Sequence, residues 1–155
     1  MSLAIDMAKR YEIAPANGYA GDVLPKTAWR ILEEIPEALL IDVRTTAEWA
    51  YVGGPDVRAI GKTPVTIEWQ IFPSMQVDAD FATKLKERIG PVQDAPLLML
   101  CRSGARSAAA ARAMTAAGYR RCFNVANGFE GVLDDAGHRG GTSGWKADGL
   151  PWSQK

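Results

Sequence analysis

Cys101 stands at the junction between a short apolar segment and a polar loop. Residues 97–100 (LLML) have the length and composition of a buried strand, and residues 102–107 (RSGARS) follow the cysteine. The alanine-rich segment 108–118 then predicts a helix that ends at Gly118. In such a strand–loop–helix unit, the backbone N–H groups of the loop and the positive end of the helix converge where the strand ends. We therefore expect the Cys101 side chain to exist largely as a thiolate, held in an anion-binding loop.

A cysteine that closes an apolar strand is more often a buried core residue, and this alternative has to be weighed. Arg102 and Arg106 lie in the same loop and argue against a purely structural role for Cys101, because nearby positive charge stabilises a thiolate. Gly104, three residues after the cysteine, also suits a loop that turns at the exit of a strand. We predict that Cys101 is a catalytic nucleophile.

A carboxylate and a guanidinium mark the end of another predicted strand. Residues 39–43 (LLIDV) form an apolar segment that contains Asp42, and Arg44 comes next. An Asp and an Arg at the end of a strand could support a neighbouring loop through hydrogen bonds. The alternative is a partly exposed ion pair of little energetic weight, and the sequence leaves both interpretations open.

The remaining elements follow from hydrophobic periodicity and from start and stop signals. Residues 25–35 predict a helix, with Asp22 as its candidate cap and a proline in its first turn. Thr45 or Thr46 can cap one or two helical turns in residues 47–51. Strands are also predicted at residues 65–69 and 121–125, and a helix at residues 78–90.

Apolar strands that alternate with helices predict an α/β domain with a mainly parallel sheet between helix layers. Ligands bind outside the carboxyl ends of the strands in such sheets. Cys101 and Asp42 are both expected at strand ends of this kind, so the two predicted sites agree in position.

Residues 53–63 (GGPDVRAIGKT) contain a Gly-Lys pair and invite comparison with a phosphate-binding P-loop. A P-loop has four residues between its first glycine and the Gly-Lys pair, whereas six residues separate Gly54 from Gly61 here. Pro64 also stands where the P-loop helix would begin. We predict a surface loop without a nucleotide-binding role.

Composition and length limit the classes of protein to consider. The 155 residues include 18 basic and 18 acidic side chains, and 47% are hydrophobic, which suits one domain with a sizeable core and indicates neither a nucleic-acid nor a membrane partner. We expect an arm or short helix at residues 1–21, the domain at residues 22–152 and a tail at residues 153–155. No secretory signal or transmembrane segment is recognisable, so we expect a soluble cytoplasmic protein.

The chain contains two cysteines and one histidine. These numbers fit neither a disulfide framework nor a zinc site, and they argue against a Cys–His dyad. His138 lies in a polar loop and is expected to be solvated. Cys122 is expected to be a core thiol, since a resolving role would require that the fold brings it close to Cys101.

Several segments of the chain resemble the single-domain rhodaneses. They are LLIDVRTTAEW at residues 39–49, LLMLCRSGARSAAAARAMTAAGY at residues 97–119, CFNVANGFEGVLDD at residues 122–135 and GWKADGLPW at residues 144–152. The resemblance runs from about Asp22 to Trp152. It implies a rhodanese-like three-layer α/β fold with a central five-stranded parallel sheet, and sulfur transfer through a cysteine persulfide.

The resemblance also implies roles for individual residues. Cys101 would hold the persulfide, and Asp42 and Arg44 match a strand-end Asp-x-Arg that would help to support the loop. Ala105 occupies a variable loop position that should influence the choice of substrate. The residues that would cradle the persulfide are Arg102, Ser103, Gly104, Ala105, Arg106 and Ser107.

One segment departs from the family pattern. Rhodaneses commonly carry a His-Ile-x-Gly-Ala type segment soon after the Asp-x-Arg strand, whereas this chain has YVGGPDVRAIGKT at residues 51–63. The shape of this loop and its contribution to the pocket therefore cannot be carried over from the family.

The implied reaction is a two-step sulfur transfer from a small anionic donor such as thiosulfate to cyanide, a thiol or a sulfur-accepting protein. Arg102 and Arg106 would attract and orient the donor. Neither a metal nor an organic cofactor is required.

Two other classes of function are considered. Cysteine-dependent phosphatases and arsenate reductases have five residues between the cysteine and the arginine of a similar loop, whereas four separate Cys101 from Arg106. The shorter loop suits a single sulfur atom better than a tetrahedral phosphate. A non-catalytic binding or regulatory module usually lacks the nucleophile, which is present here.

Overall fold

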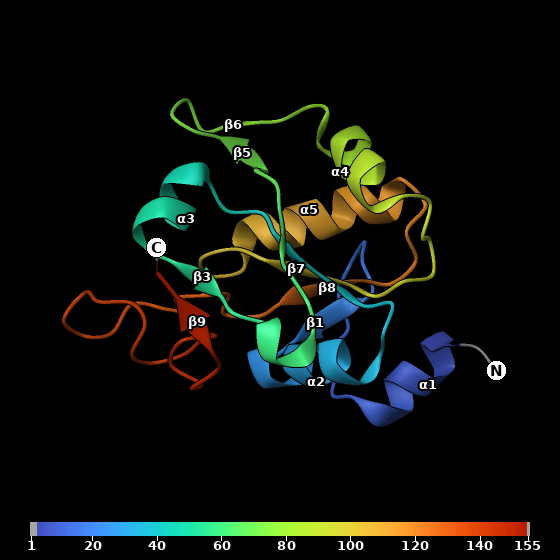
Figure 1. The fold of residues 1–155 in the computed structure, drawn as a ribbon, viewed down its shortest axis with the longest axis horizontal. Helices are drawn as coiled ribbons and strands as arrows, with labels where there is room; N and C mark the ends of the chain where they lie inside the picture. The colour runs from blue at the N-terminus through green and yellow to red at the C-terminus, as the bar shows by residue number, and fades with distance from the viewer. Residues whose placement is uncertain (1–2, 155) are drawn as a thin grey trace.

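Five short strands pair side by side in the computed structural model, which describes residues 3–154 (Figure 1). All of their pairings are parallel, and the strand order is β1-β8-β7-β2-β4. Because parallel strands all end at the same edge, residues that follow different strands meet there. The strands are β1 (Gly21–Val23), β2 (Leu39–Asp42), β4 (Val65–Thr66), β7 (Leu97–Leu100) and β8 (Cys122–Val125).

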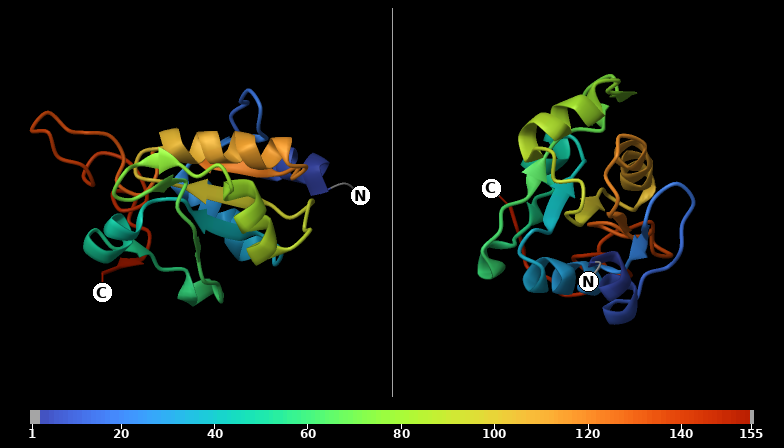
Figure 2. Two further views of the ribbon diagram at one scale, coloured as in Figure 1. Left: turned by 90° about the horizontal axis from the view of Figure 1, so that it is seen from above. Right: turned by 90° about the vertical axis from the view of Figure 1, so that its right-hand side faces the viewer.

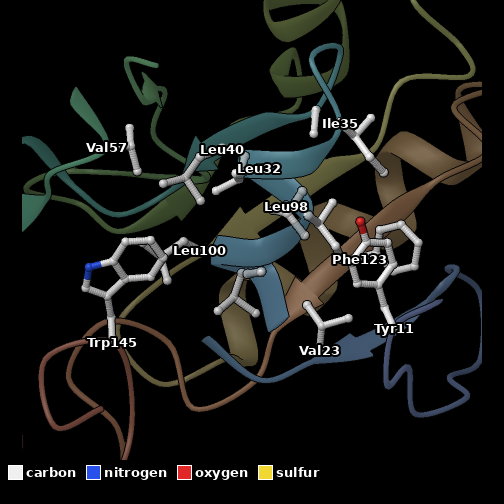
Figure 3. Packing of buried hydrophobic residues seen from close by; sticks show 14 of the residues in the cluster. Tyr11, Val23, Leu32, Ile35, Leu40, Val57, Leu98, Leu100, Phe123 and Trp145 are labelled. Atoms are coloured by element: carbon white, nitrogen blue, oxygen red, sulfur yellow. The ribbon is translucent and has the colours of Figure 1, made fainter. Parts of the chain in front are cut away.

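Helices cover both faces of this sheet, as Figure 2 shows. Alternate residues of a strand point to opposite faces, and β7 accordingly supplies Leu98 and Leu100 to one core cluster and Leu97 and Met99 to another. Helices α1 (Leu3–Arg10) and α2 (Pro25–Glu34) contribute to the first cluster, shown in Figure 3. Helices α4 (Phe81–Ile89) and α5 (Ala105–Ala116) contribute to the second. The expected three-layer α/β fold is therefore confirmed.

Local sequence signals located several helices correctly. Pro25 is the first residue of α2. Helix α3 (Thr46–Tyr51) begins after Thr45, whose hydroxyl accepts a hydrogen bond from the Glu48 N–H in a capping box. Gly90 ends α4.

Two predictions near strands were wrong. Asp22 does not cap α2, because it pairs with Asn124 of β8 inside strand β1, and Leu24 occupies the N-cap position of the helix. The strand predicted at residues 65–69 is limited to the two residues of β4, and a hairpin of β5 (Gln70–Ile71) and β6 (Gln76–Val77) follows it. Short strands leave a weak hydrophobic pattern, which explains both errors.

The segment predicted as a surface loop, residues 53–63, is partly incorporated into the fold. It contains β3 (Gly54–Pro55) and a short 3-10 helix, η1 (Arg58–Ile60), and Val57 between them is fully buried. Strand β3 pairs with β9 (Trp152–Ser153) near the end of the chain. No sequence pattern predicted that these two segments pair.

The C-terminal segment closes one end of the core. Trp145 is completely buried, and its ring lies edge-on to that of Trp29, with 5.9 Å between the ring centroids. None of the helices in residues 3–154 has the length and apolar composition needed to cross a membrane.

Candidate active site

Cys101 lies at the carboxyl edge of the sheet, immediately after β7 ends at Leu100. Its side chain is only 1% exposed, yet it contributes to the lining of an open pocket of about 840 Å³. Cys101 therefore packs in the core and borders the pocket with only a small part of its surface.

The loop of residues 101–106, named here the active loop, turns back over the sulfur. The Gly104 N–H donates a hydrogen bond to Cys101 Sγ at 3.1 Å, and the Ser107 hydroxyl lies 3.1 Å from the same atom. Gly104 has a φ of 114° and is the N-cap of α5, a left-handed conformation that glycine adopts without steric cost. The first N–H groups of α5 and the positive end of its dipole therefore lie beside the cysteine.

Of the six predicted loop residues, Gly104 and Ser107 contact the sulfur, and the other four line the same pocket as Cys101. Their roles toward a substrate stay predictions. These residues are Arg102, Ser103, Gly104, Ala105, Arg106 and Ser107.

The two arginines of the loop differ in their surroundings. Arg106 forms a bidentate ion pair with Glu48, in which Nη1 lies 2.6 Å from Oε1 and Nη2 lies 2.9 Å from Oε2. The hydrogen bond to Glu48 raises the pKa of Arg106. Burial alone would raise the pKa of Glu48, but the hydrogen bond and charge of Arg106 hold it below its ordinary value. Arg102 is exposed and lines the pocket, so it is the guanidinium better placed to meet an anion.

Glu48 was missed by the sequence analysis. Its carboxylate also accepts hydrogen bonds from the N–H and hydroxyl of Thr45, both at 3.1 Å, as part of the capping box of α3. A glutamate three residues after a threonine cap is a recognisable helix signal. Its pairing with Arg106, 58 residues away, could not be read from that signal.

The active loop is held from behind by the turn at residues 127–131. The Phe129 N–H donates to the Cys101 carbonyl at 2.8 Å, and the N–H groups of Glu130 and Gly131 donate to the Arg102 carbonyl at 2.9 and 3.2 Å. No role was predicted for this turn. Its signal was the NGFEG segment, whose glycines suit a tight backbone approach.

The structure decides one of the two alternatives for Asp42 and Arg44, and their support of the loop stays a prediction. Their side chains are 2% and 0% exposed, so the interpretation as a partly exposed ion pair was wrong. Arg44 donates to both carboxylate oxygens of Asp42, at 3.0 and 2.8 Å, and to the Gly53 carbonyl at 2.8 Å. Its guanidinium also lies over the Phe129 ring, 4.5 Å from the centroid. The pair therefore reaches the active loop through Phe129.

The walls of the pocket come from segments that were not predicted to contribute. They include Gln70 and Met75 near the β5–β6 hairpin, and Leu133, His138 and Arg139 from the segment after the 127–131 turn. His138 is exposed, as expected of a solvated histidine.

Cys122 lies at the other end of the sheet from Cys101. It pairs with Leu97 in the parallel register of β7 and β8, four residues before Cys101. Four strand residues span roughly 13 Å, which is too far for a disulfide. Burial raises the pKa of the Cys122 thiol to about 11. Cys122 is therefore a core thiol and not a resolving cysteine.

Within residues 3–154, no group of three or more His, Cys, Asp or Glu side chains is arranged to hold a metal ion.

Comparisons with known proteins cover nearly the whole chain. The family model described as the STR4 middle domain matches residues 21–155. The uncharacterized protein RC0915 of Rickettsia conorii is 37% identical over 125 residues, which span 81% of this chain and 90% of that protein. The protein THYLAKOID RHODANESE-LIKE of Oryza sativa subsp. indica is 26% identical over 152 residues, which span 98% of this chain and 29% of that longer protein.

A solved structure shows the same fold at higher identity. The crystal structure of Rv0390 from M. tuberculosis matches with a TM-score of 0.81 and 45% sequence identity, covering 88% of this chain and 99% of the other. The arrangement of strands and helices described above is therefore that of an experimentally observed fold.

Gly128→Ala should destabilise the protein by about 1–3 kcal/mol. A Cβ at this position would lie 2.5 Å from the Cys101 carbonyl oxygen and 2.6 Å from the Arg102 carbonyl group, and φ is +61°. Gly61→Ala is the matched control, because Gly61 also has a positive φ (+73°) but nothing lies within 4 Å of its Cβ position. Urea unfolding would measure both variants, and equal stability of the two would contradict the close approach of turn and loop.

Glu48→Gln should lower the free energy of unfolding by about 1–3 kcal/mol at pH 7, with a smaller effect in acid. The pKa of Glu48 is below its ordinary value of 4.5 in the folded protein, so the carboxylate stabilises the fold above that pH. This contribution is lost as the pH falls and the folded carboxylate becomes protonated. Urea unfolding at several pH values would measure it, with the exposed Glu33→Gln as control. A difference between Glu48→Gln and the wild type that does not change with pH would contradict the ion pair.

Proposed function

This chain belongs to the STR4 middle-domain family and is rhodanese-like in sequence and fold, and we propose that it is a sulfurtransferase that carries sulfur on Cys101. The observation that carries this proposal is the position of the Cys101 sulfur. Cys101 borders an open pocket at the N-terminus of α5, and its sulfur accepts a hydrogen bond from the Gly104 N–H. Fixed N–H donors of this kind stabilise a negative charge that forms during a reaction.

The proposed reaction has two balanced steps. The Cys101 thiolate attacks the outer sulfur of a donor such as thiosulfate, the S–S bond of the donor breaks, and sulfite leaves with the electron pair. The Cys101 persulfide then gives its outer sulfur to cyanide or a thiol, and the Cys101 thiolate is released. Neither step needs an external oxidant or reductant, so no redox cofactor is needed.

The outer sulfur of the persulfide would carry the negative charge within the active loop. The first-turn N–H groups of α5 and the dipole of the helix favour an anion at this position. Arg102 would bring an anionic donor toward the sulfur, whereas Arg106 would mainly hold the loop in place because its charge is shared with Glu48.

Loop length supports sulfur over phosphate as the group transferred. Four residues separate Cys101 from Arg106, and a loop of this size encloses a smaller volume than the five-residue spacing of cysteine-dependent phosphatases. The pocket is also wide enough for a larger acceptor, including a thiol displayed by another protein. The proposal includes a protein thiol as a possible sulfur acceptor. It also includes a reducing compartment, such as the cytoplasm, as the place of the reaction.

Intact-protein mass after incubation with thiosulfate tests the proposal directly. The wild type and Cys122→Ala should each gain the mass of one sulfur atom, and cyanide should remove it as thiocyanate. Cys101→Ser should gain nothing, because it lacks the attacking thiolate. The proposal fails if no persulfide donor adds sulfur to the wild type, and hydrolysis of an aryl phosphate by the same preparation would favour the phosphatase alternative.

Arg102→Ala should raise the KM for thiosulfate about tenfold, with a smaller change in kcat, because it removes a charged hydrogen-bond donor from the pocket. Lys26→Ala is the matched control, since it removes one exposed positive charge at α2, outside the pocket. Steady-state rates of thiocyanate formation at saturating cyanide would measure both variants. Equal KM values for the two variants would contradict the role assigned to Arg102.

A further inference from the structure

A row of polar groups runs behind the Cys101 sulfur, away from the pocket. Ser107 Oγ lies 3.1 Å from Sγ and 2.5 Å from Asn124 Oδ1. The Asn124 amide donates to Asp22 Oδ1 at 3.0 Å, and the Tyr19 hydroxyl donates to the same oxygen at 2.8 Å. Ser107 belongs to α5, Asn124 to β8 and Asp22 to β1, and Tyr19 lies just before β1. The reaction proposed above does not use Asn124, Asp22 or Tyr19.

The direction of these hydrogen bonds is fixed from the Asp22 end. A carboxylate can only accept, so it turns the amide nitrogen of Asn124 toward itself and leaves Oδ1 facing Ser107. Two oxygen atoms can approach to 2.5 Å only with a proton between them. A serine hydroxyl has one proton, so Ser107 donates its single hydrogen bond to Asn124 Oδ1.

Ser107 then presents a lone pair to the Cys101 sulfur. A thiol accommodates this by donating its S–H to Ser107, but a thiolate requires donors around it. To supply one, Ser107 would have to give up its hydrogen bond to Asn124. In a persulfide the negative charge sits on the outer sulfur, in the active loop, and the inner sulfur makes no such demand.

We propose that Asn124, held by Asp22, is a positioning residue that withholds the Ser107 proton from Cys101 and so favours the sulfur-loaded form over the free thiolate. This inference rests on the proposed sulfurtransferase function. In the reaction, the free thiolate and thiosulfate stand in equilibrium with the persulfide and sulfite, and the charges on the two sides are equal. A group that disfavours only the free thiolate shifts this equilibrium toward the persulfide.

Asn124→Leu has nearly the same shape as the wild type but no longer competes for the Ser107 proton. The Ser107 hydroxyl is then free to donate to the thiolate. We expect alkylation of unloaded Cys101 by iodoacetamide at pH 7 to become about three- to tenfold faster. The ratio of loaded to unloaded protein, at a fixed ratio of thiosulfate to sulfite, should fall by a similar factor when it is measured at a pH high enough for unloaded Cys101 to be thiolate in both proteins.

The Ser107→Ala background shows whether Asn124 acts through the hydroxyl. In that background, Asn124→Leu should change neither the alkylation rate nor the loading ratio. If the contribution of Asn124 were merely structural, Asn124→Leu would change the alkylation rate and the loading ratio equally in the wild type and in Ser107→Ala. That result would overturn the proposal.

Ser107→Ala also tests the proposal by itself if Asn124→Leu does not fold. It should alkylate no more slowly than the wild type, because Ser107 does not serve the thiolate as a donor. Alkylation that is several-fold slower would show that Ser107 donates to the thiolate and would overturn the proposal. The Cys101 peptide is measured by mass spectrometry, so that Cys122 does not contribute. If thiosulfate loads none of the proteins, the sulfurtransferase proposal fails, whereas the alkylation series still decides the role of Asn124.

Discussion

The backbone of the active loop is oriented by hydrogen bonds that its carbonyl oxygens accept. The N–H and C=O of a peptide unit point in opposite directions, and both need partners when they are buried. Here the carbonyls of Cys101 and Arg102 accept hydrogen bonds from the 127–131 turn. The orientation of the Arg102 and Ser103 N–H groups, which belong to the same two peptide units, is therefore set by a second segment of the chain.

Two further features follow from this constraint. Gly128 has no room for a side chain, because the backbone of the active loop occupies the space beside it. Arg44 packs its guanidinium on the Phe129 ring while it is paired with Asp42. A buried ion pair costs desolvation free energy, and several well-directed hydrogen bonds are needed to offset it. The pair thus contacts the turn through the Phe129 ring, and the turn is hydrogen-bonded to the active loop.

The two sides of the sulfur are built differently. On the pocket side it meets the Gly104 N–H and the positive end of α5, with Arg102 nearby. On the core side it meets Ser107, which also lies within hydrogen-bonding distance of Asn124. If Asn124 accepts the Ser107 proton, as proposed above, negative charge is better accommodated one atom further into the pocket than on Sγ itself. This difference suits a cysteine that holds sulfur between two half-reactions.

The sequence by itself determined the units whose signals are local. The apolar strand, the active loop with its glycine and the alanine-rich helix are adjacent along the chain, as are the threonine cap of α3 and the start of α2 at Pro25. Only the tertiary structure decided that Asp22 lies in a strand, that Glu48 pairs with Arg106, and that the 127–131 turn and Asn124 lie behind the sulfur. Those contacts depend on strand order and register, which bring together groups that no spacing along the chain relates.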